Sequence, residues 1–438
     1  MTSGMSERQR QHVFFTWAAQ AEARGLCVVR AQGAEFFLEN GKRYIDFESL
    51  VFNANLGHGD PRMVSAIQKQ AMELATAAPG FVYEAKAALG ERLAQITPDG
   101  LNKFFLTLGG AEANENAIKI ARLATGRHKI ISRYRSYHGA TYGALSVTGD
   151  VRRLPLEPGL PGVVRVEDPY CYRCPWSQQV DSCGRECVDH IERVIDFEGP
   201  RHIAAVLVET ITGAAGAYLP PPDYLKRLRT LCDEHGILLI VDEVLCGFGR
   251  TGKWFAVEHY GVTPDIMTMA KGITGGYAPL GAVAVSDKIA EYFEKNTLWA
   301  GLTCYGHPLS CAAANAAIDI YRQDRLVERA AQLEGVLAER LLAMQQKHAV
   351  VDGVRCKGLF SAFEFVHDKK SRKPLVSYHA KEGEMGKITE LKKRLDDFGI
   401  YMPIRGSLAM ITPPLMIDEA LLHEGLDKVD QALTQVFG

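Results

Sequence analysis

The chain has 438 residues, of which 47% are hydrophobic, so it can bury a large core divided over two or three domains. Lys and Arg number 50 against 52 for Asp and Glu, a balance that excludes the strong positive charge needed to bind nucleic acid or an anionic membrane. No apolar run approaches the roughly 18 residues that span a bilayer, and the N-terminus shows no basic and apolar leader, so we expect a cytoplasmic protein.

Residues 1–60 are predicted to form an irregular segment that contains a hairpin. Two short apolar runs, residues 35–38 and 44–47, flank a turn, which is typical of paired antiparallel strands. A helix is predicted to begin at Asp60 and Pro61, an N-cap followed by a proline in the first turn. We expect Met63, Ile67, Ala71 and Leu74 to lie on one face of this helix.

Residues 61–325 alternate short apolar runs with helical stretches. The runs that we predict to be strands are residues 103–107, 129–132, 203–209, 237–241 and 266–270. This alternation is typical of a mostly parallel central sheet flanked by helices on both faces, so we assign an α/β fold and one large domain to this range.

Residues 326–438 are predicted to form a smaller α+β domain. An apolar stripe at helical spacing from Leu326 to Met344 predicts a long helix that leads into it, and the final helix is expected to begin near Asp418. We expect the N-terminal segment to contribute to this small domain, which both chain ends would then share.

Four of the ten cysteines form two close pairs, Cys171 with Cys174 and Cys183 with Cys187. The pairs resemble the spacing of structural zinc ligands, which would clamp this loop. The gap between the pairs is shorter than the usual separation of two zinc knuckles, so we expect free thiols and no bound metal, with zinc as the alternative.

Asp242 and Lys271 each end an apolar run, at the edge of a parallel sheet where ligands collect. A lysine amine can form a Schiff base with an aldehyde cofactor, and a carboxylate can hold the ring nitrogen of that cofactor protonated. Each residue alone has a structural explanation, because Asp caps helices and Lys is common in turns. Together they suggest an enzyme that uses pyridoxal phosphate.

The other strand ends carry residues that suit the same cofactor. The glycine turn before residue 112 opens a helix whose bare amides can bind phosphate, although such turns are common without a ligand. An aromatic ring can stack on a flat heterocycle, a branched side chain can press on a ring face, and a carboxylate can orient cofactor or substrate. These candidates are Gly110, Ala111, Tyr137, His138, Glu209 and Val244.

The chain resembles the class III aminotransferases of the pyridoxal phosphate fold type I group over nearly its whole length. The likeness rests on residues 41–46, Gly57 and His58, residues 242–244, Lys271 and residues 413–415. The resemblance implies that Lys271 carries the cofactor, that Asp242 binds the ring nitrogen, and that Tyr137 and Val244 cover the two ring faces. It places the phosphate on Gly110 and Ala111 together with Thr303 of the partner subunit, and so implies a homodimer; whether dimers pair into tetramers stays open.

Two departures bear on the substrate. Many relatives have Ser in place of Ala111 and Gln in place of Leu245, and the second change resembles the branch that acts on ω-amino acids, with a narrower likeness to taurine transaminases. The resemblance implies ping-pong transfer from a donor such as taurine or β-alanine to pyruvate or 2-oxoglutarate. The alternative is an aminomutase or a decarboxylase of the same fold, which would need no keto acid.

Substrate contacts are expected from three side chains. The resemblance assigns Arg405 to the carboxylate of the acceptor, and a planar guanidinium suits that role, although many arginines simply lie at the surface. Trp17 and Phe52, with other apolar residues near them, are expected to line an aromatic pocket, unless they belong to the core.

Overall fold

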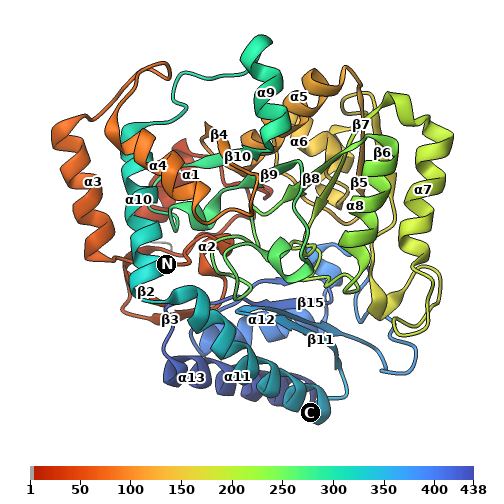
Figure 1. Ribbon diagram of the computed structural model, residues 1–438. Coiled ribbons are helices and arrows are strands. Elements are labelled where there is room, and N and C mark those ends of the chain that lie inside the picture. Colours follow the sequence, from red (N-terminus) through yellow and green to blue (C-terminus); the bar gives the residue numbers. More distant parts are fainter. Residues whose placement is uncertain (1–3) are drawn as a thin grey trace.

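The computed structural model describes residues 4–438; residues 1–3, with which the predicted N-terminal segment starts, lie outside the described residues. The central sheet has the strand order β4-β10-β9-β8-β7-β5-β6 (Figure 1). Its strands are β4 (Lys103–Thr107), β5 (Lys129–Arg133), β6 (Val163–Val166), β7 (Ile203–Glu209), β8 (Leu238–Asp242), β9 (Ile266–Met269) and β10 (Gly281–Val285). Only β10 runs antiparallel to its neighbours, so the predicted mostly parallel sheet is confirmed; β6 and β10 lie outside the predicted runs.

Helices cover both faces of this sheet because its central strands are apolar on both sides. On β7, Ala205 and Leu207 pack with the core beneath α5, whereas Val206 and Val208 pack with the core on the other face. The helices of this part are α4 (Glu84–Ala94), α5 (Gly110–Thr125), α6 (Tyr142–Val147), α7 (Glu186–Glu198), α8 (Tyr224–His235), α9 (Asp287–Lys295) and α10 (Pro308–Gln323).

The N-terminal part contains the predicted hairpin. Strands β2 and β3 pair antiparallel, and β3 also pairs in parallel with β13 (Ile400–Tyr401), so segments from both chain ends share one sheet. This pairing supports the proposed small domain built from both ends. The elements here are α1 (Gly4–His12), β1 (Val28–Gln32), β2 (Glu35–Leu38), β3 (Arg43–Asp46), α2 (Ser49–Phe52) and α3 (Pro61–Glu73).

Helix α3 begins as predicted, since the Asp60 side chain accepts a hydrogen bond from the Arg62 amide at 2.8 Å. The predicted apolar face of α3 is covered only in part. Met63 is fully buried where α3 packs on α10, but Ala71 and Leu74, near the end of the helix, are exposed.

The C-terminal part holds a second antiparallel sheet, with the order β11-β12-β15-β14. The predicted stripe of the long helix α11 is buried, and the final helix α13 starts directly after Asp418, although the Asp418 side chain makes no capping hydrogen bond. The elements are α11 (Leu326–Lys347), β11 (Val351–Lys357), β12 (Phe360–Phe365), α12 (Lys387–Asp397), β14 (Ile404–Arg405), β15 (Leu408–Ile411) and α13 (Glu419–Phe437).

The ten cysteines are free thiols. Among the side chains that the structure describes, no group of three or more His, Cys, Asp or Glu residues is arranged so that it could hold a metal ion. Over the same residues, none of the helices combines the length and apolar character that crossing a bilayer requires.

Candidate active site

A cavity of about 390 Å³ lies at the carboxyl ends of the parallel strands, where open α/β sheets bind ligands. Its wall gathers residues that follow or end β4, β5, β7, β8 and β9, the five strand ends singled out in the sequence. The predicted site residues that line it are Phe52, Gly110, Ala111, Tyr137, His138, Glu209, Asp242, Val244, Lys271 and Arg405. Trp17 and Thr303 are not among its lining residues.

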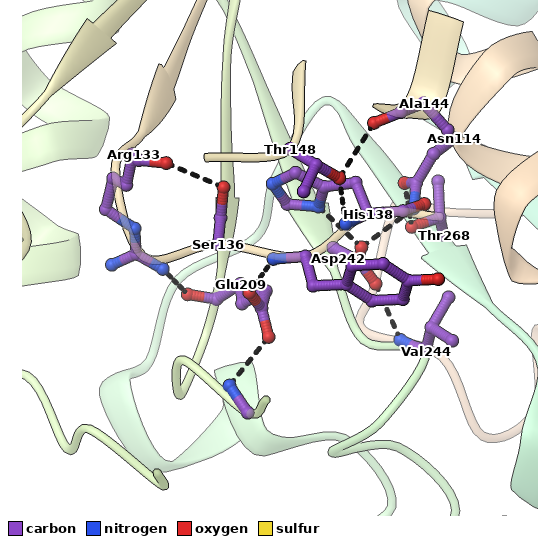
Figure 2. A network of polar contacts seen from close by, with 12 residues as sticks. Asn114, Arg133, Ser136, His138, Ala144, Thr148, Glu209, Asp242, Val244 and Thr268 are labelled. Atoms are coloured by element: carbon purple, nitrogen blue, oxygen red, sulfur yellow. Dashed lines mark hydrogen bonds and ion pairs between the residues drawn. The ribbon is translucent and has the colours of Figure 1, made fainter. Parts of the chain in front are cut away.

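Asp242, the last residue of β8, is buried and held in place by hydrogen-bond donors (Figure 2). Its Oδ2 accepts a hydrogen bond from Asn114 Nδ2 at 2.8 Å and lies 2.7 Å from His138 Nδ1. Its Oδ1 accepts from the Val244 amide at 2.9 Å. The hydroxyl of Thr268 in turn donates to Asn114 Oδ1 at 2.8 Å, so the carboxylate has a fixed orientation in the cavity wall.

Glu209 fixes the loop that carries Tyr137. Its Oε1 accepts from the Tyr137 amide at 3.0 Å and its Oε2 from the Gly213 amide at 2.7 Å. Burial raises the pKa of the Glu209 carboxyl, His138 opposes that change, and the nearby charge of Asp242 adds to it. Glu209 therefore acts on the position of the aromatic ring through the backbone.

Lys271 opens the short 3-10 helix η5 (Lys271–Ile273) directly after β9. Its φ of 46° lies in the left-handed region, which is unfavourable for residues other than glycine. Such strained residues cluster at functional sites. Its Nζ lies 5.3 Å from the centre of the Phe52 ring. Burial lowers the pKa of the Lys271 amine to about 8, although Asp242 and Glu209 act in the opposite direction. Near that pH a large fraction of the amine is neutral and can act as a nucleophile or a base.

The start of helix α5 offers backbone donors to the cavity. The first amides of a helix have no partner within it and attract anions. Close packing here depends on two glycines: a Cβ on Gly110 would lie 2.7 Å from Val244 Cγ1, and one on Gly139 would lie 2.5 Å from Ala111 Cβ. Ala111 thus fits tightly against Gly139, and its backbone amide is the polar group that it offers to the cavity.

Two arginines line the same cavity. The guanidinium of Arg152, in the 3-10 helix η1 (Val151–Leu156), lies 3.5 Å from the centre of the Tyr137 ring and is held by Asp150 through Nε at 3.0 Å. The pKa of the Arg405 guanidinium is lowered. The main cause is the loss of water around the charged group, even though part of the side chain reaches solvent, and the second cause is the nearby positive charge of Arg152. Glu48 and Asp150 act in the opposite direction, so the two guanidiniums lie at one side of the site together with two carboxylates.

Phe52 reaches the cavity from a strained turn. Residues Ser49, Leu50, Val51 and Phe52 have φ values of 51°, 48°, 60° and 64°, all in the left-handed region. The carboxylate of Asp46 stabilises this turn, since its Oδ1 accepts from the amides of Glu48 at 3.0 Å and Ser49 at 2.7 Å. Trp17 lies outside the wall, with its ring centre 5.7 Å from the Arg152 guanidinium, and Thr303 is exposed.

Among the lining residues that were not predicted from the sequence, Asn114 and Arg152 contact predicted site residues directly. Asn114 lies one helical turn after Gly110 on α5, so the helical period from the glycine turn was a signal that could have found it. Arg152 had no such signal, because its place on Tyr137 results from a contact between separate segments.

Residues 17–433 match the sequence model of the family described as aminotransferase class-III. The chain belongs to the class III aminotransferases. It is 37% identical to the leucine/methionine racemase of Thermococcus litoralis, over 98% of this chain and 95% of that protein. It is 33% identical to the taurine--pyruvate aminotransferase of Bilophila wadsworthia, over 94% and 93%. The solved taurine:2-oxoglutarate aminotransferase from Bifidobacterium kashiwanohense, in complex with PLP and glutamate, superposes with a TM-score of 0.94 at 40% identity, over 100% of this chain and 98% of that one.

The predicted family and the fold type I architecture are therefore confirmed, and this class III aminotransferase is an enzyme whose cofactor is pyridoxal phosphate. The residues present suit that group. A buried carboxylate, a half-buried lysine of lowered pKa and an open helix start line one cavity. The Nε2 atom of His138, buried beside Asp242, has no hydrogen-bond partner among residues 4–438.

Proposed function

We propose that this aminotransferase moves the amino group of an ω-amino acid or amine, of the taurine or β-alanine type, to pyruvate or 2-oxoglutarate. The observation that carries the proposal is that Arg152 and Arg405 line the same cavity as Lys271 and Asp242. Two guanidiniums suit a substrate with a sulfonate or carboxylate at one end and a reacting amine at the other. The names of the taurine aminotransferases to which the chain is similar support this donor class.

In this proposal Lys271 Nζ binds the cofactor and moves the proton. When bound, pyridoxal phosphate supplies an electron-withdrawing ring that stabilises negative charge at the reacting carbon. The neutral Lys271 amine, favoured by its lowered pKa, takes a proton from the substrate carbon and then delivers that proton to the second reacting carbon. Asp242 keeps a proton on the ring nitrogen, and His138 and Asn114 orient its carboxylate.

The remaining side chains hold and orient. The amides of Gly110 and Ala111 would bind the phosphate, and Tyr137 and Val244 would hold the ring of the cofactor between them. Donor and acceptor use the site in turn, so the kinetics are ping-pong. Phe52 forms part of the cavity wall near Lys271. Trp17 lies outside this wall and contacts the substrate when its ring moves over Arg152.

A panel of amines tests the donor class. Each amine is mixed with the holoenzyme without a keto acid, and the change in cofactor absorbance is followed in a single turnover. Taurine or β-alanine is expected to give the fastest change, with full turnover only when pyruvate or 2-oxoglutarate is added. No response to any ω-amino acid contradicts the proposed donor.

The same panel separates the alternative reactions. An aminomutase, a decarboxylase or a racemase, the last of which is the name of one relative, would convert its substrate through many turnovers with no keto acid present. Product formation that does not depend on the acceptor would therefore replace the transaminase proposal.

Arg405→Ala is expected to raise the KM for the keto acid about 30-fold, because a charge-assisted hydrogen bond to carboxylate contributes roughly 2 kcal/mol. Arg405→Lys, which keeps the charge but loses the planar fork, should have a KM for the keto acid between those of wild type and Arg405→Ala. The half-reaction with a plain alkyl amine, which has no acid group, is the control and should stay within twofold of wild type. An unchanged KM for the acceptor contradicts the assignment of Arg405.

We also propose a homodimer in which Thr303 binds the phosphate of the partner subunit. Large apolar side chains are exposed on α3, which packs on α10, and on the loops that precede α4 and α10, and exposed apolar surface can mark interfaces. Met72, Phe81, Val82, Trp299 and Leu302 are 83%, 62%, 94%, 74% and 54% exposed. Thr303 follows Leu302 directly in the chain and does not line the cavity of its own chain.

Mixed dimers test the sharing of the site. Thr303→Ala alone is expected to weaken cofactor binding about tenfold, the effect of one lost hydrogen bond to a charged group. A dimer that joins a Thr303→Ala chain to a Lys271→Ala chain has one intact site if Thr303 acts across the interface. High-affinity cofactor binding should then return in half the sites. If it does not return, or if the protein is monomeric by mass, the proposal fails.

A further inference from the structure

A second, smaller cavity is lined by all four paired cysteines, Cys171, Cys174, Cys183 and Cys187. We call it the thiol cavity. Its volume is about 20 Å³, close to the space of a single water molecule. None of its lining residues lines the active-site cavity, so the transaminase chemistry gives these thiols no role.

Three structural elements bring the thiols together. The 3-10 helix η2 (Cys171–Arg173) carries Cys171, the first turn of α7 carries Cys187, and the loop between them carries the other two. Burial raises the pKa of the Cys171 thiol, and the nearby Cys174 and Cys183 raise it further. Burial likewise raises the pKa of Cys187 to about 12, with Cys171 and Cys183 as the next causes. The Cys171 and Cys187 thiols therefore stay protonated, and they lie close to the other cysteines of the thiol cavity.

Cys183 has a different environment, because a fixed cation contacts its sulfur. Arg185 Nη1 donates to Cys183 Sγ at 2.7 Å and to the Val180 carbonyl at 2.8 Å. Its Nε donates to Asp223 Oδ1 at 2.5 Å, which holds the guanidinium in place. The guanidinium thus lies in hydrogen-bond contact with a sulfur that is partly accessible to solvent, and a neighbouring cation is typical of cysteines that react with electrophiles.

We infer that Cys183 is a peroxide-reactive thiol and that the thiol cavity closes as a disulfide between Cys183 and one of the other three cysteines. The Cys183 thiolate attacks an oxygen of hydrogen peroxide: an S–O bond forms, the O–O bond breaks, and hydroxide leaves and takes up a proton as water. A neighbouring thiol then attacks the sulfenic sulfur. The S–S bond forms, the S–O bond breaks, and the oxygen leaves with the proton of that thiol as a second water. Two thiols are oxidised and one peroxide is reduced.

Mass mapping tests the site in the holoenzyme. The protein is treated with hydrogen peroxide, digested without reduction, and the peptides are identified. A cross-link of Cys183 to Cys171, Cys174 or Cys187 supports the inference, and Cys183→Ser should abolish it. A disulfide that leaves Cys183 out, oxidation of Cys183 without a bridge, or an unreactive Cys183 overturns the inference, as does one tightly bound zinc per chain, since zinc would occupy the thiols.

Two arginine variants test the part played by the cation. Arg185→Met is expected to slow the reaction of Cys183 with peroxide about tenfold, the loss of one charged hydrogen bond. Arg227→Met is the matched control: Arg227 also pairs with Asp223 and donates to the Gly184 carbonyl, but it makes no described contact with the sulfur. Equal rates in the two variants overturn the role of Arg185. Cofactor absorbance and transaminase activity, both expected to be unchanged, show that each variant is folded.

Discussion

Replacing Lys271 by alanine is expected to lower turnover by about four orders of magnitude or more, because it removes both the covalent anchor of the cofactor and the group that moves the proton. Lys271 is the only lysine among the described residues that line the cavity, so no other amine of this chain can take its place. Turnover with the best donor of the amine panel, and the absorbance of the bound cofactor, measure the two losses.

Lys271→Arg is the control for charge. It keeps a cation in the cavity but should fail as the alanine variant does, because a guanidinium stays protonated. In the wild-type apoprotein, cofactor attachment should speed up as the pH rises through about 8, the lowered pKa of Lys271, because only the neutral amine attacks. Activity of either variant within tenfold of wild type contradicts the assignment, provided both unfold at the wild-type temperature.

Asp242→Asn is expected to reduce kcat by about 10²-fold to 10³-fold, the usual effect of removing one preorganised electrostatic group. The substitution keeps the shape of the side chain but removes the negative charge that faces His138 Nδ1 at 2.7 Å. The rate of the half-reaction with the amine donor measures the loss, and the cofactor absorbance shows whether the ring nitrogen has changed its protonation.

Thr268→Val separates that loss of charge from a disturbance of packing. It removes the hydrogen bond to Asn114 Oδ1 and leaves the Asp242 side chain itself unchanged. A stability loss of about 1 to 3 kcal/mol is expected for the unsatisfied amide, with a reduction in kcat below tenfold. If Thr268→Val lowers kcat as much as Asp242→Asn, the effect comes from the shape of the network and not from the carboxylate.

The core of the fold could be predicted because its strands are buried on both faces. Runs such as residues 203–208 are apolar throughout, and that pattern is typical of the centre of a parallel sheet. Strand β10 has the same character, yet its antiparallel direction is decided by its pairing with β4 and β9, which no local pattern reports. The exposed end of α3 shows the other limit, since a helical stripe does not tell whether its own chain covers it.

The site could be predicted only in part for a related reason. Asp242 and Lys271 follow apolar runs directly, so the topology of the sheet brings them to one edge without further information. Arg152 reaches Tyr137 through the packing of a 3-10 helix, and Phe52 enters the cavity through a left-handed turn of non-glycine residues. Sequence propensity argues against such a turn, and the hydrogen bonds of Asp46 that stabilise it become visible only in three dimensions.

The pairing of β3 with β13 also dictates an order of events during synthesis. Ile45 leaves the ribosome early, but its parallel partner Ile400 emerges only near the end of translation. The strands of the central sheet, which end with β10, are complete long before that. A nascent chain can therefore form the strands that carry Lys271 and Asp242 before the segment with Arg405 has left the ribosome.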